Sequence, residues 1–183
     1  MTTEVRTGVP GSAEALRYVM GRFVSGVTIV TALRNDIRYA MTATAVSSVS
    51  LEPPLILVCV SKTSRFHSAI IEVDTWAISL LAADQLAIAR HFSNRARDLL
   101  TQFDNVDHVA APVSGAPLIE GATAWMECMT YARYDGGDHT IVVGELVRAS
   151  GPRSIDEALD ESPLTYYQGA YWPQPTAPKG SQP

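Results

Sequence analysis

The sequence predicts a mainly β domain, built as an antiparallel barrel or sandwich with helical insertions. Six or so segments rich in β-branched and apolar residues follow one another at short spacing, and most are joined as hairpins. Strands do not alternate regularly with long helices, which disfavours a doubly wound nucleotide-binding fold. The chain has 183 residues, 46% hydrophobic and 18% charged, which is the size and composition of one folded domain.

The N-terminal part is predicted to form one helix and one β-hairpin. Ser12 is a suitable N-cap, and apolar residues at i, i+3, i+4 and i+7 place a stripe on one helix face: Leu16, Val19, Met20 and Phe23. The β-branched run at 27–33 and the extended run at 37–46 predict two strands joined by the turn Arg34-Asn35-Asp36.

The middle of the chain is predicted to alternate strands with short helices. After Pro53-Pro54, the apolar run 55–61 predicts a buried strand. We expect Ser64 to cap a short helix that reaches about residue 73, followed by a strand at 75–81. Asp84 is expected to cap a helix through residue 92, and residues 95–103 to form a second helical piece.

The C-terminal half predicts a long hairpin. After a loop containing Pro112 and Pro117, strands at 122–134 and 139–149 flank a glycine-rich turn. A short helix is expected at 154–159, and residues 164–172 close the domain.

The folded domain is predicted to span residues 13–172. The ends, residues 1–12 and 173–183, are rich in Pro, Gly, Ser and Thr and are expected to be mobile. The first twenty residues lack the pattern of a signal peptide, and no apolar run approaches the roughly 18 residues of a membrane span. We therefore expect a cytoplasmic protein, with Cys59 and Cys128 as buried thiols rather than a disulfide.

Charge and motif content argue against several functions. A net charge of −5 offers no basic field, so neither nucleic acid nor a membrane surface is an expected partner. The sequence contains no dinucleotide-binding glycine fingerprint, no P-loop and no hydrolase nucleophile elbow. The four histidines lie far apart without ligand spacing, so no metal site is expected.

The most unusual segment is 42–50, in which five of nine side chains carry a hydroxyl: Thr42, Thr44, Ser47, Ser48 and Ser50. Small side chains let a planar ligand approach the backbone, and hydroxyls with N–H groups bind polar heterocycles or phosphates. The alternative is a Thr- and Ser-rich strand whose polar face is simply solvated.

Three further segments are candidates for binding. Ser61-Lys62-Thr63-Ser64-Arg65 opens a predicted helix, whose positive end favours an anion. Arg90, His91 and Arg95 gather at another helix end, and His139 lies at the rim of a hairpin. The alternatives are ordinary helix caps with solvated charges and an inert turn histidine.

The chain contains, in this order, the motifs Gly26-Val27-Thr28-Ile29-Val30-Thr31, Met41-Thr42-Ala43-Thr44-Ala45 and Gly136-Gly137-Asp138-His139, with further matching segments at 47–55, 144–146 and 163–171. In this order and spacing they resemble the flavin reductase-like, FMN-binding split-barrel family. More narrowly, they resemble the small reductase components of two-component flavin-dependent monooxygenases.

The resemblance implies a split antiparallel barrel that forms a homodimer, with FMN or FAD bound near the subunit interface. It implies that residues 42–48 line the flavin ring and ribityl chain, that 61–64 meet the phosphate, and that 92–93 close over it. The residue at 139 would orient the nicotinamide beside the C-terminal tyrosines. The implied site residues are Met41, Thr42, Ala43, Thr44, Ala45, Ser47, Ser48, Ser61, Lys62, Thr63, Ser64, Phe92, Ser93, His139, Tyr166 and Tyr171.

The implied activity is hydride transfer from NADH or NADPH to FMN or FAD, with reduced flavin diffusing to a separate flavin-dependent monooxygenase. Such transfer needs the nicotinamide held against the flavin and donors for the developing charge, so no essential general acid is expected. Two alternatives stay open. One is a reductase that keeps its flavin tightly bound and reduces another acceptor; the other is a flavin- or haem-binding carrier or sensor without turnover.

Overall fold

The computed structural model describes residues 10–151 and 162–173. Its elements are α1 (Ala13–Met20), β1 (Ser25–Gly26), β2 (Thr28–Arg34), β3 (Ile37–Ala43), β4 (Val46–Leu51), β5 (Pro54–Ser61), α2 (Arg65–Ile70), β6 (Thr75–Leu80), the 3₁₀ turn η1 (Ala83–Gln85), α3 (Leu86–Ser93), β7 (His108–Ala110), β8 (Pro117–Ile119), β9 (Ala124–Gly136), β10 (His139–Ser150), β11 (Leu164–Tyr167) and β12 (Ala170–Pro173).

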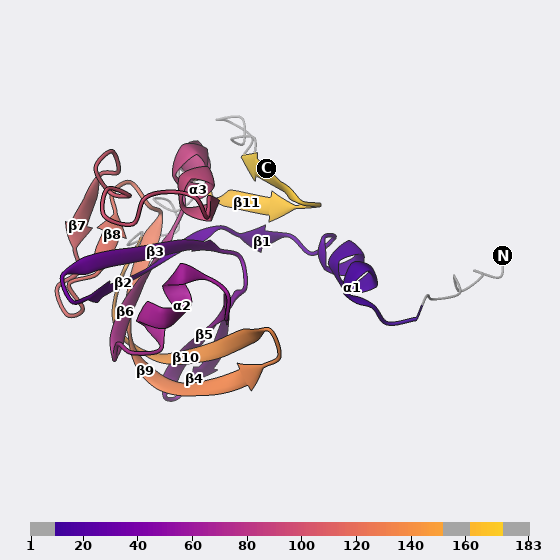
Figure 1. Cartoon of the computed structure of the whole chain (residues 1–183), viewed down its shortest axis with the longest axis horizontal. Coiled ribbons are helices and arrows are strands. Elements are labelled where there is room, and N and C mark those ends of the chain that lie inside the picture. The colour runs from indigo at the N-terminus through magenta and orange to yellow at the C-terminus, as the bar shows by residue number, and fades with distance from the viewer. Residues whose placement is uncertain (1–9, 152–161, 174–183) are drawn as a thin grey trace, which may run out of the picture.

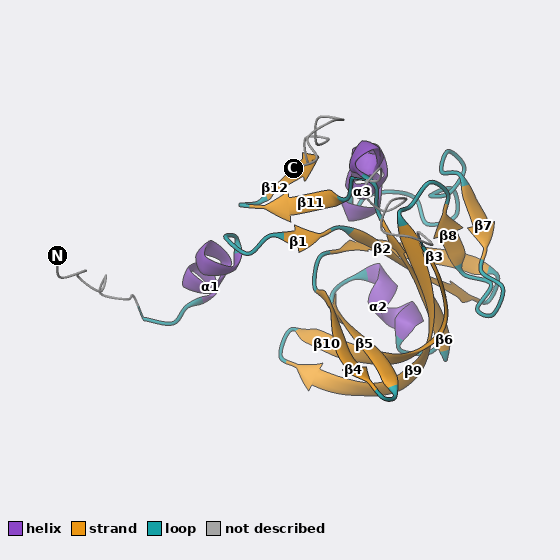
Figure 2. Ribbon diagram, turned by 180° about the vertical axis from the view of Figure 1, so that it is seen from behind, coloured by secondary structure: helices purple, strands orange, loops and turns teal. Residues whose placement is uncertain are grey.

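A seven-stranded sheet forms the body of the molecule, in the order β3-β2-β6-β9-β10-β5-β4. All neighbouring strands in it are antiparallel. The sheet curls round, and α2 lies within the curl (Figures 1 and 2). A three-stranded sheet, β1-β11-β12, and the hairpin β7–β8 complete the fold. The prediction of a mainly β, antiparallel fold with helical insertions is confirmed.

The helix α2 fills the interior of the curled sheet. It buries Phe66, Ala69 and Ile70, which the helical spacing places on one face, and these pack in one core cluster with Trp76 of β6. The helix ends at Ile70, and only a turn continues to residue 72, so it is shorter than predicted. A Cβ atom on Gly144 of β10 would lie 2.5 Å from Trp76 Cζ2, so the indole packs directly against the strand's backbone.

The prediction of one strand over 37–46 is wrong. β3 ends at Ala43, paired with β2, and β4 begins at Val46, paired with β5. Thr44 and Ala45 carry the chain between the two edges of the sheet, and the Ala45 carbonyl accepts a 3.1 Å hydrogen bond from Cys59 N. The residue types on both sides of this break suit an extended chain, so only the change of pairing partner, a tertiary effect, reveals it.

The predicted helical piece at 95–103 is also wrong, because this segment forms turns. Asn94 Oδ1 accepts a 2.9 Å hydrogen bond from Ala96 N, and Asp98 Oδ1 accepts a 2.8 Å bond from Leu100 N. Bonds of this kind offer the backbone an alternative to helical hydrogen bonding, which is why Asn and Asp favour turns.

Two of the three predicted helix caps are confirmed. Ser12 Oγ and Ser64 Oγ each accept a 3.1 Å backbone hydrogen bond at the start of α1 and α2. The prediction for Asp84 is wrong, because α3 begins after η1. There Gln85 Oε1 accepts a 3.0 Å bond from Ala82 N.

The long hairpin β9–β10 is confirmed, with its turn at Gly137 and Asp138. The proline-containing loop also holds the small hairpin β7–β8, which was not predicted. Residues 164–172 form a further hairpin, β11–β12, while the helix predicted at 154–159 lies outside the described residues. Cys128 is buried and Cys59 half-buried, and both are free thiols.

Helix α1 forms at the predicted place but ends at Met20, so Phe23 of the predicted apolar stripe lies just beyond the helix, and the whole stripe is exposed. Leu16, Val19, Met20 and Phe23 are between 53% and 68% exposed, and the helix projects away from the barrel (Figure 1). None of the helices in residues 10–151 and 162–173 has the length and apolar character that a bilayer crossing requires.

Candidate functional site

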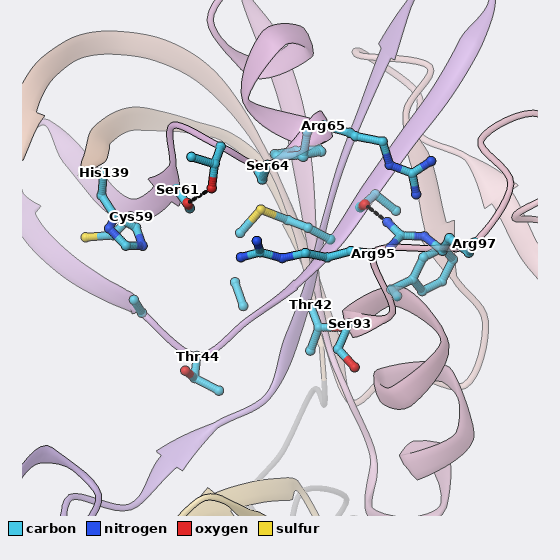
Figure 3. A pocket seen from close by; sticks show the side chains of 17 residues that line it. Thr42, Thr44, Cys59, Ser61, Ser64, Arg65, Ser93, Arg95, Arg97 and His139 are labelled. Atoms are coloured by element: carbon cyan, nitrogen blue, oxygen red, sulfur yellow. Dashed lines mark hydrogen bonds between the residues drawn. The ribbon is translucent and has the colours of Figure 1, made fainter. Parts of the chain in front are cut away.

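A cavity of about 360 Å³ opens where the chain passes from β3 to β4. Its walls come from the end of β3, the end of β5, the start of α2 and the end of α3, with His139 of β10 at the rim (Figure 3). The curl of the sheet brings these distant segments together.

Hydroxyl groups line the cavity from several elements. Thr42 Oγ1 donates a 2.7 Å hydrogen bond to the Ala89 carbonyl and so ties β3 to α3. The hydroxyls of Ser61 and Thr63 lie 3.1 Å apart, and Ser64 caps α2. These bonds hold the wall in place, so polar groups are arranged before a ligand enters.

Arg97 forms a fixed cation in the cavity wall. Its Nε donates a 2.8 Å hydrogen bond to Gln102 Oε1, its Nη2 donates to the Ala40 carbonyl, and its guanidinium carbon lies 5.4 Å from the centre of the Phe92 ring. Burial, and secondly the nearby charge of Arg65, lower the pKa of Arg97 to about 10. The guanidinium therefore stays charged at neutral pH.

Two more arginines line the cavity, and within residues 10–151 and 162–173 neither forms an ion pair. The side chain of Arg95 reaches across the cavity, while Arg65 lies beside Arg97 at one end (Figure 3). Placing cations of like charge together is unfavourable unless an anion joins them. The cavity therefore suits a phosphate, which guanidinium groups bind with paired hydrogen bonds.

His139 and Cys59 lie at the other end of the cavity (Figure 3). The His139 ring is 41% exposed and lies 2.7 Å, Nδ1 to Oδ1, from Asp138. This hydrogen bond, and then the histidine's charge, hold the pKa of the Asp138 carboxyl below its usual range. Burial raises the pKa of the Cys59 thiol, so the thiol stays protonated and is a poor nucleophile.

A second, larger hollow of about 890 Å³ meets the first at Thr44, Ala45 and Cys59. Most of its lining is apolar. The largest group of lining residues lies between Arg17 and Thr28, and others come from β4, β5 and β11. Met20, the last residue of α1, and Phe23, which follows the helix, form part of its wall.

Comparison with known families agrees with this geometry. The model of the flavin reductase like domain matches residues 20–173. The chain belongs to this family. The resemblance found in the sequence motifs is therefore confirmed, and the cavity described above is the candidate active site of a flavin reductase domain.

Individual relatives share most of this domain. An NADH-dependent FAD reductase of Streptomyces globisporus is 46% identical over 142 residues, which cover 77% of this chain and 78% of the relative. The flavin-dependent monooxygenase reductase subunit HsaB of Rhodococcus jostii is 33% identical, over 85% of this chain and 74% of its own.

A solved structure matches the fold. The NADH:FAD oxidoreductase SgcE6 of Streptomyces globisporus, in complex with NAD and FAD fragments, superposes with a TM-score of 0.83 at 38% identity, covering 97% of this chain and all of that one. The curled antiparallel sheet is thus the split barrel of flavin reductases, as the resemblance implied.

The structure brings most of the predicted site residues of this flavin reductase domain together, but not all of them. Three of the predicted residues do not line the 360 Å³ cavity but line the second hollow: Ser47, Ser48 and Tyr166. Lys62 and Tyr171 line neither; Tyr171 packs in a core cluster and Lys62 bonds to the β9–β10 hairpin. The predicted residues that line the 360 Å³ cavity are Met41, Thr42, Ala43, Thr44, Ala45, Ser61, Thr63, Ser64, Phe92, Ser93 and His139.

Arg97 is the main cavity residue that sequence reasoning missed. It lies in the segment 95–103, which was predicted as a helix, and that prediction gave no contact partner for its side chain. Arg65 and Arg95 stood in the two predicted cationic clusters, whose neighbouring lysine and histidine turn out to point elsewhere: His91 Nε2 lies 2.8 Å from the Gln102 carbonyl. The exposed Asn94 turn before Arg95 and Arg97 was the available signal for a loop.

Proposed function

We propose that the chain is an NADH-dependent flavin reductase that takes up free FAD or FMN, reduces it and releases it. The observation that carries this proposal is the cavity itself, which combines hydroxyls, three arginines and a rim histidine in a member of the flavin reductase family. FAD is the favoured flavin, because an FAD reductase is the 46% identical relative.

The residues present suit a flavin. The backbone at 42–45 is free of bulky side chains and lets a planar ring approach, and the hydroxyls beside it supply hydrogen bonds. The guanidinium groups of Arg65, Arg95 and Arg97 would hold phosphate at the far end. We assign Phe92 and Ser93 to the wall that closes over the flavin.

A bound flavin supplies the electron-accepting ring, to which the nicotinamide gives its hydride. The protein's part is to hold the two rings together, exclude water and offer donors toward the charge that develops on the flavin. His139 at the rim would orient the nicotinamide. Ser47, Ser48 and Tyr166, in the adjoining hollow, would contact the part of the ligands that extends beyond the cavity.

Steady-state kinetics test this function. NADH oxidation by the purified protein is expected to require added flavin and to saturate with its concentration, because free flavin is a substrate. The assay compares NADH with NADPH, each with FMN and with FAD. Oxidation that is independent of added flavin would favour a tightly bound flavin with another acceptor, and flavin binding without oxidation would favour a carrier or sensor.

We propose that the reduced flavin diffuses to a separate flavin-dependent monooxygenase. The relative HsaB supports this proposal, because its name identifies it as the reductase subunit of such a monooxygenase. A cytoplasmic location and the domain limits 13–172 stay predictions.

We further propose that the chain forms a homodimer through α1. An isolated helix of eight residues is marginal in water and needs tertiary packing. The exposed stripe of α1 continues into the apolar hollow of about 890 Å³, which gives one contiguous apolar surface for a second copy. This hollow joins the cavity, so the second copy would lie beside the flavin.

Charge on this stripe is expected to separate the subunits. Light scattering should give twice the chain's 19.8 kDa for the wild type and for Val109→Glu, a control at an exposed apolar residue of β7. The double variant Leu16→Glu/Phe23→Glu should give a monomer, because burying two carboxylates in an apolar contact is unfavourable. A monomeric wild type, or a dimeric double variant, would contradict the assignment.

A further inference from the structure

We propose that Lys62 is a positioning residue that fixes the β9–β10 hairpin, and with it His139, at the rim of the cavity. This inference rests on the proposed flavin reductase function and gives Lys62 a different role from the phosphate contact that its sequence position suggested.

Lys62 is placed for this role by strand register. β5 pairs with β10 so that Ser61 lies opposite His139. The next residue of the chain, Lys62, therefore lies beside the hairpin turn, and its backbone N donates a 3.0 Å hydrogen bond to the Asp138 carbonyl. The main-chain pairing of β5 thus extends one residue into the turn.

The side chain of Lys62 adds two contacts to the same hairpin. Its Nζ donates a 2.6 Å hydrogen bond to the Gly137 carbonyl and forms an ion pair with Asp135 at the end of β9. Together with the backbone bond, Lys62 holds the last residues of β9 and both turn residues. We call this set of contacts the Lys62 latch.

The hairpin needs such an anchor because its tip is exposed. Residues 134–138 are exposed, and the turn is a two-residue one whose first member, Gly137, has φ of +77°. Glycine permits this conformation but leaves the backbone free to move in solvent. An exposed ion pair contributes little to global stability. We therefore expect the Lys62 latch to fix the position of the hairpin tip rather than to stabilise the whole fold.

His139 directly follows the latched residues. Its ring is bonded to Asp138, whose carbonyl receives the Lys62 N–H, and the ring lines the cavity. Movement of the turn would therefore move the imidazole relative to the flavin site. The phosphate role falls to Arg65, Arg95 and Arg97, which line the cavity as Lys62 does not.

The protonation of Asp135 supports the same picture. The hydrogen bond from Lys62, and then its charge, hold the pKa of the Asp135 carboxyl below its usual range. The ion pair is therefore intact at neutral pH and weakens only as the pH falls through that lowered pKa.

The test compares three full-length variants. Lys62→Met removes the ammonium and keeps the aliphatic stem, Lys62→Arg keeps a cation and donors, and Arg34→Met breaks a surface ion pair with Glu72 away from the cavity. For Lys62→Met we expect the KM for NADH to rise about tenfold while the KM for flavin stays within about twofold. Lys62→Arg should restore most of the NADH affinity, and Arg34→Met should match the wild type.

Hydrogen exchange gives a readout that does not need turnover. In Lys62→Met the amides of 136–141 should exchange faster than in the wild type, while those of β2 and β6 stay protected. A higher flavin KM with an unchanged NADH KM would make Lys62 a phosphate ligand and overturn the proposal, as would behaviour equal to that of Arg34→Met. If the wild type shows no turnover, the reductase function fails and the exchange data alone decide whether the latch exists.

Discussion

The double variant Arg65→Met/Arg95→Met is expected to have a KM for FAD or FMN about a hundredfold higher than that of the wild type. Both arginines line the cavity, and neither forms an ion pair in the described part of the chain, so both are available to a phosphate. A hydrogen bond to a charged group contributes roughly 1.4 kcal/mol or more, and losing two such contacts corresponds to about a hundredfold in affinity. Steady-state kinetics with varied flavin measures the change.

Riboflavin separates phosphate recognition from ring recognition. It carries the same ring and ribityl chain without a phosphate, so the double variant and the wild type should bind it equally. Arg148→Met, at an exposed position of β10 outside the cavity, controls for the loss of positive charge. Equal losses for riboflavin and FMN would mean that the arginines support the ring or the fold instead. The difference between FMN and riboflavin should also shrink at high salt, because salt screens exposed charges.

Alanine at Glu127 is expected to lower the free energy of unfolding by about 4 kcal/mol, the largest stability effect that we anticipate from a single change. Glu127 on β9 is fully buried. Its Oε1 accepts hydrogen bonds from Val113 N at 2.9 Å, Ser114 N at 2.8 Å and Ser114 Oγ at 3.0 Å. Removing the carboxyl would leave these partly buried donors without their acceptor and open a cavity at the fully buried Glu127 position.

Denaturant unfolding measures this effect, with Glu127→Gln as the matched variant. The amide keeps one carbonyl oxygen for the three donors, so its loss of stability should be clearly smaller than that of alanine. If the two variants lose equal stability, the acceptor role of Oε1 is not what stabilises the loop. Each of the two variants, if it folds, should have the same KM for flavin as the wild type, because Glu127 does not line the cavity.

Much of the fold was predictable because its strands depend on local patterns. The hairpins β2–β3 and β9–β10 have turn residues, Asn35 and Gly137, whose positive φ suits their residue types. The passage from β3 to β4 was not predictable, because Thr44 and Ala45 suit an extended chain and only their pairing partners change. The exposure of the α1 stripe was likewise not predictable, because helical periodicity predicts an apolar face but not which part of the molecule covers it.

The candidate site was predictable in its segments but not in each side chain. Residues 41–45 and His139 were assigned through ordered motifs and do line the cavity. The contacts of Lys62 and Arg97 could not be predicted, because their partners are distant in sequence: Lys62 forms an ion pair with Asp135, and Arg97 donates a hydrogen bond to the Ala40 carbonyl. Judged by residue type alone, either side chain could bind a phosphate. Only the tertiary fold decides which of the two lines the cavity.

The central claim is that flavin enters, is reduced and leaves, and anaerobic stoichiometry tests it most directly. The protein is mixed, without oxygen, with FAD in large molar excess over the protein and with at least as much NADH as FAD. The loss of flavin absorbance then measures the reduced flavin. We predict that nearly all the FAD is reduced, one molecule for each NADH oxidised, and far more FAD than protein. Reduction that stops at one flavin per protein chain, or that does not depend on the protein, would contradict the account.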